Sequence, residues 1–144
     1  MPLLHSIISQ RLESLCRTTS SDFSALAIVE PDGRHVRWRY AYGNRTDRYK
    51  QMMLKPGLGP AGVALRTGRP AAWEDRITSS ADKSPVIPMM IAEQLRCAFA
   101  YPITNRNMIC AVLLIARRLP LPYTGSESTH IEDTLPDLLP LLQE

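Results

Sequence analysis

The sequence has few of the residues that metal centres, disulfide frameworks and covalent catalysis require. It contains 3 cysteines and 3 histidines in 144 residues. Cys16, Cys97 and Cys110 are an odd number, and their spacing fits neither a metal site nor a set of disulfides. Free, buried thiols in a reducing compartment explain this sparse usage best, so we expect a cytoplasmic protein without a metal or cofactor.

Long apolar runs are also missing. The longest, from Met108 to Ala116, is about half of the roughly 18 residues that a membrane span needs. The first residues carry neither a basic leader nor a small-residue cleavage site. We therefore expect a protein that is not exported and has no membrane partner.

What is present is ordinary for a globular domain, with 44% hydrophobic and 22% charged residues. We expect one domain spanning 1–144.

The net charge is only +3, but five arginines cluster in one stretch, namely Arg34, Arg37, Arg39, Arg45 and Arg48. No nucleic-acid-binding motif accompanies them, so a solvated basic sheet face is expected and no nucleic-acid partner.

The first part of the chain predicts a helix followed by a hairpin. Residues 3–15 place apolar side chains at helical spacing. Residues 23–29 form a compact apolar run typical of a buried strand, and Pro31-Asp32-Gly33 is typical of a turn. The next stretch alternates, which predicts one inward face and one outward arginine face. The inward face is expected to hold Val36, Trp38, Tyr40 and Tyr42.

A glycine-rich segment, residues 57–62, is the most informative stretch. Pro60 suits the first turn of a helix over 61–66, which Gly68 would cap. Further along we expect a short strand over 71–73, a mobile loop over 74–84 and a short helix over 88–95. Strands over 97–103 and 108–116 would close the sheet.

The last stretch predicts an amphipathic helix within 126–144. Thr129 and Glu132 have the spacing of a capping box, and Pro136 and Pro140 should kink or break the helix. The element order predicts an α+β fold. Terminal helices (1–20 and 126–144) should pack on one face of an antiparallel sheet, and crossover helices and loops within 21–117 should form a pocket on the other.

With these elements placed, residues 21–117 resemble a GAF domain. The motifs are the hairpin ending at Gly43-Asn44, the segment Gly57-Leu-Gly-Pro-Ala-Gly62, the tail Thr67-Gly-Arg-Pro70 and the closing pair of strands. The chain is most similar to stand-alone GAF proteins of the NreA type. That resemblance implies a cytoplasmic nitrate receptor that modulates a sensor histidine kinase of a two-component system.

The resemblance also implies the ligand-binding residues. A pocket tryptophan falls on Trp38, an anion-facing helix start on Pro60, Ala61 and Gly62, and an opposing wall on Ile87 and Met89. A helix N-terminus can hold a small anion without a charged side chain, because its N–H groups are unpaired. Two positions depart from the pattern. Pro60 has no N–H, and Ile87 lacks the hydroxyl of the expected tyrosine, so a more apolar ligand stays open beside nitrate.

Two other function classes stay open. The chain could be a ligand-free interaction module whose terminal helices form a homodimer or dock a kinase. Alternatively, some GAF domains reduce free methionine sulfoxide with a cysteine in or just before the glycine-rich segment. No cysteine stands there in this sequence, so we expect a protein that is not an enzyme and has no catalytic residues.

Overall fold

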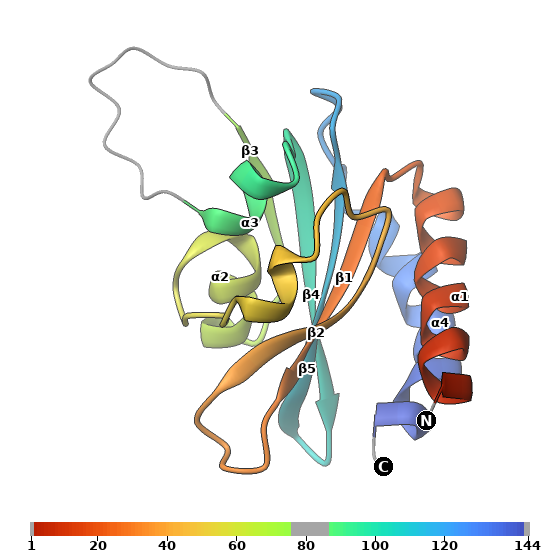
Figure 1. Ribbon diagram of the computed structural model, residues 1–144, viewed down its shortest axis with the longest axis vertical. Helices are drawn as coiled ribbons and strands as arrows, with labels where there is room; N and C mark the ends of the chain where they lie inside the picture. Colours follow the sequence, from red (N-terminus) through yellow and green to blue (C-terminus); the bar gives the residue numbers. More distant parts are fainter. Residues whose placement is uncertain (1, 76–86, 143–144) are drawn as a thin grey trace.

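Five antiparallel strands form the sheet at the centre of the molecule (Figure 1). The computed structural model describes residues 2–75 and 87–142. The strand order is β2-β1-β5-β4-β3. In chain order the strands are β1 (Phe23–Val29), β2 (Val36–Tyr42), β3 (Ala71–Glu74), β4 (Cys97–Asn105) and β5 (Met108–Arg117).

Helices cover both faces of this sheet. The long terminal helices, α1 (Pro2–Thr19) and α4 (Glu127–Leu142), lie side by side on one face (Figure 1). The short segments η1 (Arg48–Gln51), α2 (Gly59–Thr67) and α3 (Pro88–Ala92) lie on the other. The α+β fold expected from the sequence is thus confirmed.

The sheet divides the hydrophobic core in two because neighbouring strand residues point to opposite faces. Leu113 packs toward Ile8 and Leu12 of α1, whereas its neighbour Leu114 packs toward α2 and α3. Both leucines are fully buried. Burying a side chain of this size contributes roughly 1.5–3 kcal/mol, so the two faces together stabilise the sheet.

The predicted alternation in β2 is wrong beyond Trp38. Leu26 pairs with Tyr40 and the next residue, Ala27, pairs with Trp38, which leaves Arg39 as an extra residue in a β-bulge. The bulge reverses the facing of the rest of the strand. Val36 and Trp38 therefore face α2 and α3, while Tyr40 and Tyr42 pack on the side of the terminal helices.

The start of the C-terminal helix also differs from the prediction. Thr129 lies inside α4, which begins at Glu127. The Glu127 carboxylate accepts backbone hydrogen bonds from Thr124 (3.1 Å) and Gly125 (2.9 Å). The capping interaction therefore lies one turn earlier than the sequence pattern indicated.

Proline does not break the helix, contrary to one of the two outcomes expected. α4 continues through Pro136 and Pro140 to Leu142. Ile131 and Leu138 are fully buried, and Ile131 packs in the core between α1 and the sheet. This packing holds the helix despite the backbone hydrogen bonds that proline removes.

Other elements agree with the sequence or fall outside the described part. Gly68 adopts a left-handed conformation (φ 73°) at the end of α2, as expected of a C-terminal cap. Helix α3 ends at Ala92, three residues before the predicted end. The predicted loop over 74–84 lies outside the described residues from 76 onward. Within the described residues, no helix is long and apolar enough to cross a bilayer.

Candidate functional site

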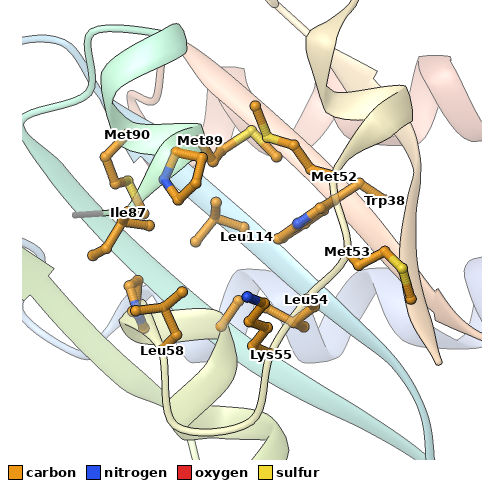
Figure 2. A pocket seen from close by; sticks show the side chains of 14 residues that line it. Trp38, Met52, Met53, Leu54, Lys55, Leu58, Ile87, Met89, Met90 and Leu114 are labelled. Atoms are coloured by element: carbon orange, nitrogen blue, oxygen red, sulfur yellow. The ribbon is translucent and has the colours of Figure 1, made fainter. Parts of the chain in front are cut away.

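A cavity of about 40 Å³ lies between β2, α2 and α3 (Figure 2). One water molecule requires roughly 10–15 Å³, so the space suits a ligand of a few heavy atoms. The segment that follows η1 forms a further side. Leu54 donates its N–H to Val36 (2.7 Å), and Met52 accepts a longer bond from Trp38 (3.4 Å). These bonds cover the edge of β2 and fix Met52 and Leu54 beside the cavity.

The structure brings together most of the residues singled out in the sequence. Trp38, Pro60, Ala61, Ile87 and Met89 all line this cavity. Gly62 is not among its lining residues, although it lies in the same turn of α2 as Ala61.

Trp38 presents the one polar atom of its side chain to the cavity. The residue is only 4% exposed. No hydrogen bond joins its indole N–H to another described residue, although a buried indole usually finds a partner. Figure 2 shows the ring nitrogen on the edge that faces Leu114 and the enclosed space. Among the described residues, the cavity therefore contains a donor without an acceptor.

The start of α2 supplies further donors. Its first helical bond runs from the Gly62 N–H to the Leu58 carbonyl (3.2 Å). The N–H groups of Gly59 and Ala61 precede that bond, so they have no acceptor within the helix. Pro60, between them, has no N–H. Gly59, Pro60 and Ala61 line the cavity, so the positive end of the helix dipole lies at its wall with two N–H groups rather than three.

A tight turn sets the position of this helix. The Leu58 N–H donates to the Lys55 carbonyl (3.1 Å) across Pro56 and Gly57, and Gly57 has a φ of 84°. Proline second and a positive-φ glycine third are typical of a type II turn. Gly62 packs directly under it, because a Cβ on Gly62 would lie 2.3 Å from the Lys55 carbonyl oxygen. Gly62 therefore positions the site rather than lining it.

The opposite wall is apolar. Ile87 lies against the helix start, with side-chain carbons 3.2 Å from where a Cβ on Gly59 would be. Met89 and Met90 are buried beside it, and Leu114 forms the floor from β5. These groups offer a ligand contact area but no hydrogen bonds.

Sequence analysis missed several lining residues. Met52, Met90 and Leu114 have patterns typical of the core, so no local signal separates them from other buried residues. Lys55 was also missed. It is the one charged side chain among the described residues that line the cavity. Its place directly before Pro56-Gly57 was a usable signal, since a turn there holds it next to the helix start.

Neither a cysteine nor a cluster of metal-binding side chains lies at the cavity within the described residues. Cys16, Cys97 and Cys110 are not among the lining residues, and burial raises the pKa of each thiol. No three histidine, cysteine or carboxylate side chains of the described residues gather where they could hold a metal ion.

A buried polar cluster anchors α3, the helix that carries Met89 and Met90. Glu93, 1% exposed, follows α3. Its carboxylate accepts hydrogen bonds from the Arg45 N–H (2.7 Å), from the Thr46 N–H and hydroxyl (3.2 Å each) and from Arg118 (2.9 Å). Arg118 also donates to the carbonyl oxygens of Glu93 and Gly43. The end of β5 is thereby tied to the end of α3 and to the loop after β2.

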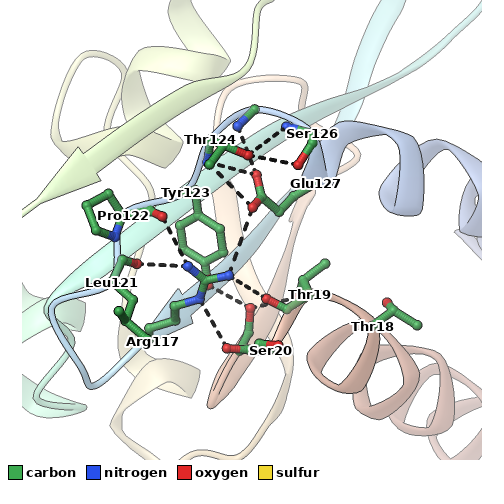
Figure 3. Close-up of polar contacts among 12 residues, drawn as sticks. Thr18, Thr19, Ser20, Arg117, Leu121, Pro122, Tyr123, Thr124, Ser126 and Glu127 are labelled. Atoms are coloured by element: carbon green, nitrogen blue, oxygen red, sulfur yellow. Dashed lines mark hydrogen bonds and ion pairs between the residues drawn. The ribbon is translucent and has the colours of Figure 1, made fainter.

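Arg117, the neighbouring residue, forms its contacts on the other face of the sheet, where α1 and α4 lie (Figure 3). Its guanidinium lies 4.0 Å from the centre of the Tyr123 ring and 3.9 Å from the Glu127 carboxylate. It also donates to four carbonyl oxygens, those of Thr19, Ser20, Leu121 and Pro122. Arg117 thus joins the end of α1 to the start of α4.

The predicted basic face is partly neutralised. Arg37 and Arg39 both pair with Glu30, at 3.1 and 3.5 Å. The Arg45 guanidinium donates a hydrogen bond to the side-chain oxygen of Gln94. The sequence cluster therefore does not form one continuous patch of unpaired arginines.

Comparison with known proteins gives matches in fold. No family model matches the chain, and no curated protein matches it. Among solved structures, an NreA protein from Staphylococcus aureus, mutated in its nitrate binding site, is 26% identical with a TM-score of 0.70. The match covers 83% of this chain and 90% of that one.

Two further structures show the same fold at lower identity. The GAF domain of a two-component sensor histidine kinase from Bacillus halodurans is 14% identical, with a TM-score of 0.75 over 96% of this chain and 92% of that one. A type II free methionine-R-sulfoxide reductase from Thermoplasma acidophilum is 11% identical, with a TM-score of 0.73 over 98% and 93%. The chain therefore has the fold of a GAF domain, and it is similar to NreA in sequence as well as in fold.

Proposed function

We propose that this protein is a small-ligand sensor that binds nitrate or a similar small monoanion in the cavity between β2, α2 and α3. The observation that carries the proposal is the indole N–H of Trp38, a buried residue. This N–H has no partner within the described residues and is directed into the cavity. The amides of Gly59 and Ala61 add two donors at the positive end of α2. Trp38, Pro60, Ala61, Ile87 and Met89 would contact the ligand, and Gly62 would hold the helix start in place.

The size and chemistry of the cavity support a small, weakly hydrated anion. Three N–H donors cannot replace a complete hydration shell, so the entry of a strongly hydrated anion would be unfavourable in free energy. Nitrate has four heavy atoms and spreads its charge over three oxygens. It can therefore accept the three bonds while its faces contact Met89, Ile87 and Leu114.

The likeness to NreA and to a sensor-kinase GAF domain supports a place in signalling. We propose that residues 1–144 act as one cytoplasmic GAF domain that modulates a sensor histidine kinase, with the terminal helices α1 and α4 available for homodimerisation or docking. Binding, rather than catalysis, would be its activity. The raised pKa of the three thiols and their absence from the described cavity wall support this against a reductase.

Calorimetry and thermal unfolding with nitrate, nitrite, chloride and sulfate test the proposal. A ligand at 100 times its Kd stabilises the native state by about 2.7 kcal/mol. Nitrate should therefore raise the Tm by several degrees, with a larger effect than chloride or sulfate at equal ionic strength. Equal effects of all four salts, or none, would contradict anion sensing and favour a ligand-free interaction module.

A further inference from the structure

Lys55 stands apart from the other residues of the cavity because it carries a charge. The remaining described lining residues are apolar side chains, glycines or prolines, apart from the Trp38 indole N–H. No carboxylate lines the described part of the cavity. Figure 2 shows the Lys55 amino nitrogen directed toward the space that the labelled side chains enclose.

The Lys55 ammonium group has no other partner in the part of the chain that the structure describes. Within the described residues, Lys55 forms neither an ion pair nor a side-chain hydrogen bond, whereas Lys50 lies 4.0 Å from Asp47. The backbone of Lys55 is held firmly, since its carbonyl oxygen accepts the Leu58 N–H in the turn and lies against Gly62. A fixed backbone and a free ammonium place a positive charge beside the helix start.

We infer that Lys55 is a specificity-determining residue that selects an anionic ligand at the mouth of the cavity. The inference rests on the proposed function and deepens it. The helix dipole and the Trp38 N–H favour any acceptor, charged or neutral, whereas a full positive charge discriminates by ligand charge. Pro60 removes one amide from the helix start, and the lysine offsets that loss electrostatically.

The side chain is exposed, and this sets the expected magnitude. Exposed charge pairs contribute little, typically up to about 1 kcal/mol, and salt screens them. Lys55→Gln should therefore weaken nitrate binding about two- to fivefold at low ionic strength. The difference from the unmodified protein should shrink as ionic strength rises, and Lys55→Arg should keep the original affinity.

The experiment is nitrate calorimetry on the full chain at low and high concentrations of sodium gluconate, whose anion is too large for the cavity. Lys50→Gln is the matched control, because it makes the same change in net charge at a lysine that does not line the cavity. A loss in Lys55→Gln alone supports the inference. Equal affinities of the two glutamine variants overturn it and leave the proposed function intact, whereas no nitrate binding by the unmodified protein overturns both.

Discussion

Trp38 combines a large apolar ring with a single N–H, and the two parts have different roles. The ring packs in the core on the α2 and α3 side of the sheet. The N–H points into the cavity without a described partner. A substitution that keeps an aromatic ring in the core and removes the N–H can therefore separate a packing role from a binding role.

Trp38→Phe should fold and bind nitrate poorly. Loss of a charge-assisted hydrogen bond costs about 1.5–3 kcal/mol, so nitrate affinity should fall roughly tenfold to a hundredfold. Calorimetry measures the affinity, and thermal unfolding without ligand reports the fold. Unchanged affinity would mean that the indole N–H does not touch the ligand. Trp38→Ala is less informative, because the space it leaves in the core would itself destabilise the protein.

At the scale of elements, the turn over 55–58 and the start of α2 form one unit. Gly57 provides the positive φ that the turn needs, and Gly62 allows the turn to lie directly on the helix. The position of the Gly59 and Ala61 amides follows from this close packing, as does that of Lys55.

Gly62→Ala should displace this unit. The new Cβ would lie 2.3 Å from the Lys55 carbonyl oxygen and 3.1 Å from the Gly57 nitrogen, so the turn must move. Overpacking of this kind costs typically about 1–3 kcal/mol, and nitrate affinity should fall along with the Tm.

Gly68→Ala, at the far end of the same helix, is the control. Nothing lies within 4 Å of a Cβ there, so only the strain of a left-handed alanine is expected, roughly 1–2 kcal/mol, with nitrate affinity unchanged. Equal nitrate affinities of the two alanine variants would show that the turn does not position the site.

Two elements show why local patterns fail over parts of this chain. The alternation of β2 indicated one face for Trp38 and Tyr40, but the bulge at Arg39 places them on opposite faces. A bulge arises from the pairing of β2 with β1, and the alternation of residues within β2 carries no information about that pairing. Similarly, Thr129 and Glu132 match a capping box by spacing, yet Glu127 caps the helix, because tertiary contacts at Arg117 and Tyr123 set where the chain turns.

At the scale of the whole molecule, adjacent arginines at the end of β5 connect its layers. Arg118 reaches Glu93 and Gly43 on the cavity side, and Arg117 reaches α1 and α4 on the other. Glu93 is fully buried, so the hydrogen-bond donors around its carboxylate take the place of water. The two clusters therefore contribute to holding both helical layers against the sheet.

Arg118→Met should destabilise the protein strongly. Removing one partner of a buried ion pair typically costs about 3–5 kcal/mol, because the other charge stays buried. Chemical denaturation measures the free energy of unfolding. Arg69→Met, at an exposed arginine beyond α2, should change it by less than about 0.5 kcal/mol.

A double-variant cycle tests whether Glu93 is the partner responsible. Adding Glu93→Gln to Arg118→Met should cost less than the sum of the two single changes, by about 0.5–3 kcal/mol. Additive effects, or an Arg118→Met protein as stable as Arg69→Met, would show that the pair contributes little to holding α3.

The sequence alone was sufficient for the α+β fold and for most strands and helices, because hydrophobic periodicity, turn residues and caps act over a few positions. Its resemblance to NreA-type proteins, rather than any local pattern, implied the five residues that line one cavity. Only the tertiary structure decided the facing of Tyr40, the indirect role of Gly62 and the place of Lys55 beside the cavity. Each of these depends on contacts between segments distant in the chain or across a packed turn, where register and close approach, rather than local pattern, determine which atoms meet.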